Sequence, residues 1–112
     1  MVFSFFRKNE IIPEVLVAYK WRFPDQIEVS IESSKDGGYI ARIGNFPGCI
    51  TQAENGEELF EMVNDSINTY LEVPRHYQPY MPTFFPAEEV RRQFSIKIPE
   101  RYLKDKLILQ KA

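Results

Sequence analysis

The side chains with the greatest chemical potential in this 112-residue sequence are its single cysteine, Cys49, and its single histidine, His76. A thiol nucleophile needs a base within hydrogen-bonding reach, so these two residues would have to form the pair. Cys49, however, follows a Pro-Gly turn at the start of an expected strand, where a free cysteine usually serves as a small buried hydrophobe. We therefore expect no catalytic pair and predict that the protein is not an enzyme.

Carboxylates are the second group of interest. Glu28 and Glu32 fall on the polar face of an expected strand, Asp36 falls in a tight turn, and Asp65 falls on an expected helix. Two-metal chemistry requires several carboxylates that converge from different elements, and this spacing does not bring them together. A single cysteine also excludes an internal disulfide and a Cys-only zinc site. We predict neither a metal nor a cofactor.

The elements that position these groups begin with a three-stranded meander. Residues 27–33 alternate between apolar and polar, which is typical of a strand with one buried face. The turn Lys35-Asp36-Gly37-Gly38 supplies the positive φ that a hairpin needs, so residues 39–43 should pair with residues 27–33. Pro47-Gly48 suits the centre of a type II turn. Residues 49–53 then form a short third strand.

The main helix follows this meander. Asn55 is a good N-cap residue, and Glu58 stands three positions later, where its carboxylate can reach back to the cap backbone. Apolar residues at helical spacing form one stripe: Leu59, Phe60, Val63, Ile67, Tyr70 and Leu71. Pro74 should end the helix at or just before Val73.

The flanking segments carry weaker patterns. Residues 14–23 alternate and predict an additional strand. Four prolines and four aromatic residues make residues 74–86 a stiff, extended arm. A helical turn is expected at residues 87–93, a strand at residues 94–98, and a short helix over residues 99–109. We therefore predict one α+β domain, residues 1–112, with an antiparallel three- to five-stranded sheet and one main helix packed on one face.

Composition bounds the function further. The net charge is −2, with 44% hydrophobic and 27% charged residues, which is typical of a single small globular domain and lacks the basic excess of a nucleic-acid-binding protein. No window resembles a signal peptide or a membrane-spanning helix, so we expect a cytoplasmic protein without a membrane partner. Apolar side chains near the start should pack on the core or on a second subunit, a short membrane-surface anchor being the alternative: Val2, Phe3, Phe5 and Phe6.

An ordered set of motifs lies within residues 27–72, and the residues that carry it are Gly37-Gly38-Tyr39-Ile40-Ala41-Arg42, Phe46-Pro47-Gly48-Cys49-Ile50-Thr51-Gln52, Glu57-Glu58-Leu59, Met62, Asp65-Ser66-Ile67 and Tyr70-Leu71. In order and spacing this set resembles the HicB-like antitoxin family. The resemblance implies a partial ribonuclease H-like fold, in which residues 94–98 would be a later strand of the sheet. It also implies binding to a small HicA-like ribonuclease toxin, which the antitoxin neutralises by occluding the catalytic histidine.

Many members of this family also carry a C-terminal DNA-binding module. Here residues 91–100 followed by a helix resemble the first half of a ribbon–helix–helix, but the remainder of that module is missing. We therefore expect protein binding without operator binding. The alternatives are a stand-alone HicB-like domain with another role, a DNA-binding autoregulator that uses the basic C-terminal segment, and a cryptic hydrolase.

Aromatic residues of the arm are the candidates for partner binding, with self-packing on the domain as the alternative: Tyr77, Tyr80, Phe84 and Phe85. Basic residues of the C-terminal third are the candidates for nucleic-acid contact, a solvated face being the alternative: Arg91, Arg92 and Lys97. Because one sheet with one helix leaves an edge and a face uncovered, we also expect a homodimer or a higher homo-oligomer.

Overall fold

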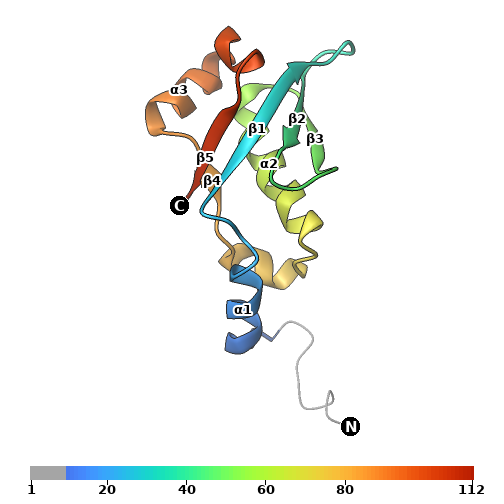
Figure 1. Cartoon of the computed structure of the whole chain (residues 1–112), viewed down its shortest axis with the longest axis vertical. Coiled ribbons are helices and arrows are strands. Elements are labelled where there is room, and N and C mark those ends of the chain that lie inside the picture. The colour runs from blue at the N-terminus through green and yellow to red at the C-terminus, as the bar shows by residue number, and fades with distance from the viewer. Residues whose placement is uncertain (1–9) are drawn as a thin grey trace.

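The computed structural model describes residues 10–112. The expectations for Val2, Phe3, Phe5 and Phe6 therefore lie outside the described residues. The fold is α+β, as predicted: a five-stranded antiparallel sheet carries one long helix across one face (Figure 1). A short helix, α1 (Pro13–Lys20), lies at one end of the molecule, and α3 (Glu88–Ile96) lies at the other.

The sheet has the strand order β3-β2-β1-β5-β4. The meander predicted from the sequence is confirmed: β1 (Gln26–Ser33) pairs with β2 (Tyr39–Ile43), and β2 pairs with β3 (Ile50–Ala53). On its other side β1 pairs with β5 (Leu107–Lys111), and β5 pairs in turn with the two-residue strand β4 (Phe84–Phe85). The last strand of the chain therefore lies inside the sheet.

Both predicted turns are present. Gly37 and Gly38 adopt φ values of +91° and +74° between β1 and β2. A Cβ atom on Gly38 would lie only 2.6 Å from the carbonyl oxygen of Ala53, so this position requires glycine. Gly48 has a φ of +84°, and the N–H of Cys49 donates to the carbonyl of Phe46 across a type II turn, N···O 2.9 Å.

Helix α2 (Gly56–Tyr70) begins at its predicted cap. The Asn55 side chain accepts from the N–H of Glu58 at 2.8 Å, whereas the Glu58 carboxylate accepts from the N–H of Glu54, one residue before the cap, at 3.4 Å. The buried stripe of α2 faces the sheet and forms the core with the inward side chains of β1, β2 and β5: Leu59, Phe60, Val63, Ile67, Ile27, Val29, Ile31, Ala41, Ile43, Leu107 and Leu109. Burial of these apolar side chains is the main stabilising contribution.

The strand predicted at residues 14–23 is wrong. This segment forms α1 (Pro13–Lys20), with Pro13 in its first turn. No residue of α1 is buried, so the alternation of apolar residues there does not report a buried face. The side chains of this segment that pack against the core follow helical spacing, at i, i+4, i+5 and i+8: Ile11, Val15, Leu16 and Tyr19.

The predictions for the C-terminal third are also wrong in part. Residues 94–98 do not form a strand, because α3 (Glu88–Ile96) extends to Ile96 and no strand follows directly. Phe94 and Ile98 are buried, but Ile96 between them is 90% exposed, so the three alternating apolar residues do not share one buried face.

The helix expected over residues 99–109 is reduced to a 3₁₀ turn, η3 (Glu100–Leu103), and β5 follows it. In β5 the side chains of Leu107 and Leu109 are buried, whereas Ile108 is exposed. This alternation is the mark of a strand with one buried face. The arm is not extended throughout either, since its first half forms a second 3₁₀ helix, η2 (Arg75–Tyr80), before β4.

Candidate protein-binding groove

An open groove of about 720 Å³ lies beside α2. One wall is the side of α2 that faces away from β3, and the other wall is built by η2, the arm, β4 and α3. Gly56 of α2 allows the two walls to approach closely at one end, because a Cβ atom at this position would collide with the carbonyl oxygen of Phe94. Close packing of α2 and α3 at one end therefore depends on this glycine.

The α2 wall is acidic. Glu57, Glu61 and Asp65 stand four residues apart, so they form a row along one side of the helix, with about 6 Å of rise between neighbours. All three are exposed, and none belongs to the four ion pairs formed within residues 10–112. The i, i+4, i+8 spacing is legible in the sequence, but without the opposite wall it indicates only a solvated helix face.

The opposite wall is aromatic and basic. The guanidinium carbon of Arg91 lies 3.9 Å above the ring centroid of Phe85, a cation–π contact. The Phe85 ring in turn meets Phe60 of α2 edge-on, with centroids 6.3 Å apart. Arg75 of η2 completes this wall. Two predicted candidates, Phe85 and Arg91, are thus brought together in the groove.

Two asparagines of α2 also line the groove. The Asn64 carboxamide accepts from the N–H of Phe84 at 2.7 Å and donates to its carbonyl at 3.0 Å, so it fastens β4 to α2. Asn68 donates to the carbonyl of Asn64 at 3.2 Å, but its buried Oδ1 accepts from none of the described residues. An unpaired buried acceptor is costly in free energy.

Two other aromatic candidates do not face a partner. Tyr77 is 4% exposed and Phe84 is fully buried, so for these residues the structure matches the alternative of self-packing. The hydroxyl of Tyr77 accepts from the N–H of Ile12 at 3.0 Å and thereby ties α1 to η2. Tyr80, by contrast, is 52% exposed at the end of η2.

The basic candidates are dispersed. Arg91 stacks on Phe85, Arg92 pairs with Glu88 of the same helix at 2.9 Å, and Lys97 is exposed just beyond α3. The ribbon of a ribbon–helix–helix requires a strand over residues 94–98, and this segment is helical up to Ile96. The structure therefore lacks the strand that a ribbon–helix–helix DNA-binding module would need at residues 94–98.

Residues weighed for chemistry lie in separate surroundings. The buried Cys49 places its sulfur 3.7 Å from the carbonyl oxygen and the hydroxyl of Ser66, whereas the His76 ring packs on Tyr77 with centroids 4.5 Å apart. Glu28 and Glu32 pair with Lys106 and Arg42 on the sheet face opposite α2. Within residues 10–112, no three His, Cys, Asp or Glu side chains are grouped as metal ligands.

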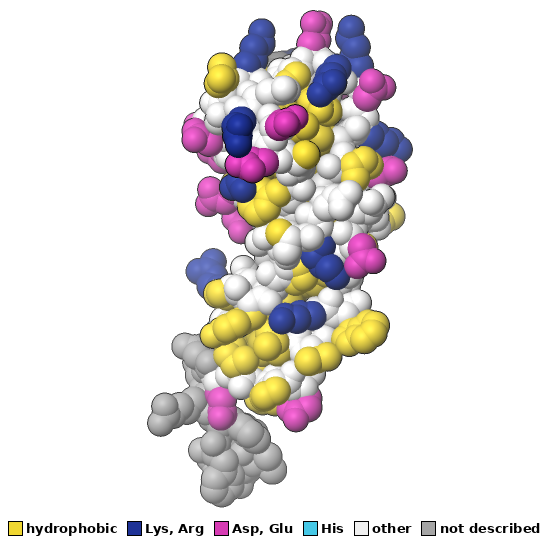
Figure 2. Space-filling view, turned by 90° about the vertical axis from the view of Figure 1, so that its left-hand side faces the viewer, with side chains coloured by type: hydrophobic (Ala, Val, Ile, Leu, Met, Phe, Trp, Pro, Cys, Tyr) yellow, Lys and Arg dark blue, Asp and Glu magenta, His cyan; other side chains and the backbone are white. Residues whose placement is uncertain are grey.

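A second exposed apolar area surrounds α1. Val17 is 51% exposed and Trp21 is 83% exposed. Figure 2 shows hydrophobic side chains gathered near the end of the molecule where α1 lies, whereas acidic and basic side chains alternate over the rest of that face. None of the helices in the described chain is long and apolar enough to cross a membrane.

Comparison with known proteins places the chain in a family. A UPF0150 protein from Archaeoglobus fulgidus is 40% identical over 50 residues, which cover 45% of this chain and 72% of the relative. The chain belongs to the UPF0150 family. UPF0150 is HicB-like, in agreement with the resemblance of residues 27–72, while the relative's name states no activity or partner. No family model and no solved structure matches the chain.

Proposed function

We propose that this UPF0150 protein is a binding module of the antitoxin kind, which neutralises a small HicA-like ribonuclease by occluding its surface, with no turnover of its own. The observation that carries the proposal is the groove beside α2, where Glu57, Glu61 and Asp65 form one row without an ion pair to any of residues 10–112. A ribonuclease must present cations to the phosphates of its substrate. The carboxylate row offers those cations a competing anionic surface.

The opposite wall supports a protein ligand in preference to a small one. Phe85 and the neighbouring Pro79 provide apolar contact, and Arg91 and Arg75 can pair with acidic groups at the rim of the same partner. Aromatic and arginine side chains around an open groove are typical of protein interfaces. The resemblance of residues 27–72 to HicB-like antitoxins supports the same class of partner.

The test is binding to a small basic ribonuclease of the double-stranded-RNA-binding-like type, taken from the neighbouring gene or recovered by native co-purification. The double variant Glu61→Lys/Asp65→Lys should weaken the dissociation constant at least about 100-fold and restore RNA cleavage, because two close charge pairs become repulsive. The matched control, Asp36→Lys/Glu100→Lys, changes net charge equally at exposed sites outside the groove and should leave affinity within about threefold.

Two results would overturn the proposal. If the groove variant and the control bind alike, the ribonuclease docks elsewhere. If no ribonuclease binds at all, the protein is a stand-alone UPF0150 domain with a different role.

A further inference from the structure

Exposed strand edges are closed by side chains at two places in this sheet. At β4, the N–H and C=O of Phe84 point away from β5, and the Asn64 carboxamide pairs with both groups. Pro82 and Pro86 flank this strand, and a proline cannot offer a backbone N–H to an incoming strand. The β4 edge is therefore closed against further pairing.

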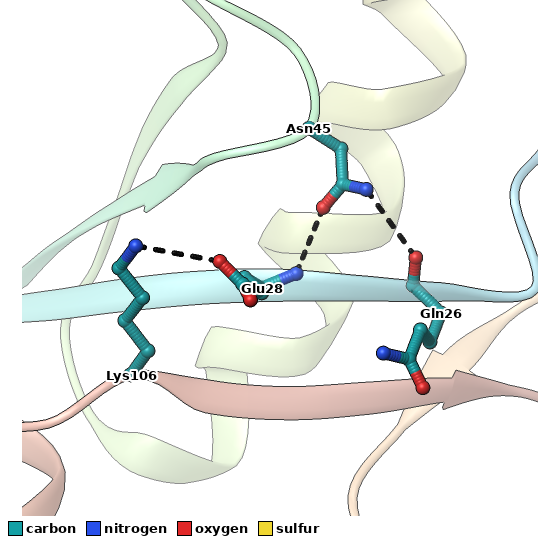
Figure 3. Close-up of polar contacts among 4 residues, drawn as sticks. All are labelled: Gln26, Glu28, Asn45 and Lys106. Atoms are coloured by element: carbon teal, nitrogen blue, oxygen red, sulfur yellow. Dashed lines mark hydrogen bonds and ion pairs between the residues drawn. The ribbon is translucent and has the colours of Figure 1, made fainter.

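The second closure is on β1, beyond the point where β2 ends. Figure 3 shows the Asn45 side chain in the position of the missing strand: its Oδ1 accepts from the N–H of Glu28 at 2.9 Å, and its Nδ2 donates to the carbonyl of Gln26 at 3.5 Å. The N–H of Gly44 donates to the carbonyl of Glu28 at 2.9 Å. Asn45 and Asn64 thus play the same part at different strands.

The edge of β3 has no such closure. The N–H of Ile43 donates to the carbonyl of Cys49 at 3.0 Å, so in this antiparallel pair Cys49, Thr51 and Ala53 face β2. Ile50 and Gln52 then point both backbone groups outward, and no side chain among residues 10–112 pairs with them. The strand also has neither a proline nor a charge of its own, the usual protections of an edge.

We propose that β3 pairs antiparallel with β3 of a second copy of this chain, which joins the two sheets into one around a twofold axis. Ile50 then faces Gln52 of the second copy and exchanges both backbone hydrogen bonds with it, and Thr51 meets its own counterpart on the axis. An antiparallel edge is complementary to itself under this symmetry, so no other surface is required.

The surroundings of the edge fit a second copy. A hollow of about 380 Å³ lies between β3 and α2, with Met62 and Tyr70 of α2 and residues 48–51 in its lining, whereas the alternation of β3 puts the Ile50 side chain on the opposite face of the sheet. Ile50 is 50% exposed and Tyr70 is 43% exposed, so an added strand would cover apolar surface. In this register Glu54 lies opposite Gly48 of the second copy, which keeps the two Glu54 carboxylates apart. β3 carries no charged residue, so a partner recognised through its charge would have no ion pair to form there.

The experiment measures the mass of the full chain by light scattering and ultracentrifugation over a range of concentrations, together with amide hydrogen exchange. A concentration-dependent dimer is expected, with the Ile50 and Gln52 amides protected. Gln52→Pro removes an outward N–H that the monomer does not use, and Ile50→Lys adds a charge to the edge; both should weaken dimerisation at least tenfold. Ile108→Lys makes the same change on the same sheet face, on the interior strand β5, and should leave the dimer intact.

Several outcomes would overturn this proposal, which does not depend on the ribonuclease. A monomer at all concentrations is one, and a dimer whose Ile50 and Gln52 amides exchange freely is another. A dimer that survives Gln52→Pro but is lost in Trp21→Ser assigns the interface to α1. A monomer whose edge amides become protected only when a ribonuclease is added assigns the edge to a foreign strand.

Discussion

The two edges of the sheet face the same physical problem and differ in how it is met. At β4 the outward backbone groups of Phe84 are paired by Asn64, and prolines flank the strand. At β3 the outward groups of Ile50 and Gln52 are left to solvent or to another chain. One asparagine carboxamide is enough to block strand pairing at β4. The absence, among residues 10–112, of a similar side chain at β3 therefore marks β3 as the edge at which another strand can pair.

The largest expected loss of stability comes from the buried residue of the β4 edge, and a much smaller loss is expected at the exposed β3 edge. Phe84→Ala should lower the free energy of unfolding by about 3–5 kcal/mol, because it opens a cavity at a fully buried site. Ile50→Ala, at the half-exposed edge position, should cost less than about 1 kcal/mol when measured at concentrations that favour the monomer. Denaturant titration of both variants measures the difference. Equal losses would contradict the assignment of the two edges.

The next largest loss of stability is expected from Asn64, whose carboxamide closes the β4 edge. Asn64→Ala should lower the free energy of unfolding by about 2–3 kcal/mol, because the N–H and C=O of Phe84 both lose their partner in a part-buried site. Asn64→Asp keeps an acceptor for the N–H but sets a carboxylate against the carbonyl oxygens of Phe60 and Phe84, so it should not restore the lost stability. Amide exchange at Phe84 should accelerate in the alanine variant, and an unchanged rate would mean that Asn64 does not protect this strand.

A substitution in the turn between β1 and β2 should disturb β3, because this turn packs against the end of β3. Gly38→Ala should cost about 2 kcal/mol, because alanine is strained at a φ of +74° and its Cβ would meet the carbonyl oxygen of Ala53 at 2.6 Å. Gly37→Ala is the matched control: its φ is also positive, at +91°, but no atom lies within 4 Å of a Cβ there. Thermal unfolding of the two variants should rank Gly38→Ala as the less stable.

The smallest effect is expected at the exposed closure on β1. Asn45→Ala should lower the free energy of unfolding by about 1 kcal/mol, since water can replace a lost partner at an exposed site. If this variant gains dimerisation that persists after Gln52→Pro, then closing an edge with asparagine does suppress strand pairing. An unchanged mass would limit the role of Asn45 to stability.

The sequence predicts the part of the fold in which local chemistry and burial agree. Residues 27–33 alternate and are buried on one side, and Asn55 caps α2 as expected. Residues 14–23 and 94–98 alternate just as clearly, but Trp21 and Ile96 are exposed, so the apolar residues at every second position do not share one buried face. Tertiary contacts decide such segments, and they are not written in a local pattern.

Little of the candidate site could be foreseen for the same reason. The acidic row on α2 is a local signal, whereas the opposite wall comes from η2, β4 and α3, whose positions depend on β5 and Asn64. Phe85 and Arg91 were identified by residue type alone. Nothing in their spacing indicates that one would stack on the other, or that Tyr77 and Phe84 would be buried nearby.

The place of β5 has a consequence for how the chain folds. β1 and β5 pair through residues as distant in the sequence as Gln26 and Gln110, so the middle of the sheet closes only after a large loop has been brought together. Such non-local pairing slows folding. Until β5 arrives, β1 has one unpaired side and β4 has no strand to join, so we expect a transient species with an unfinished sheet that is prone to aggregation.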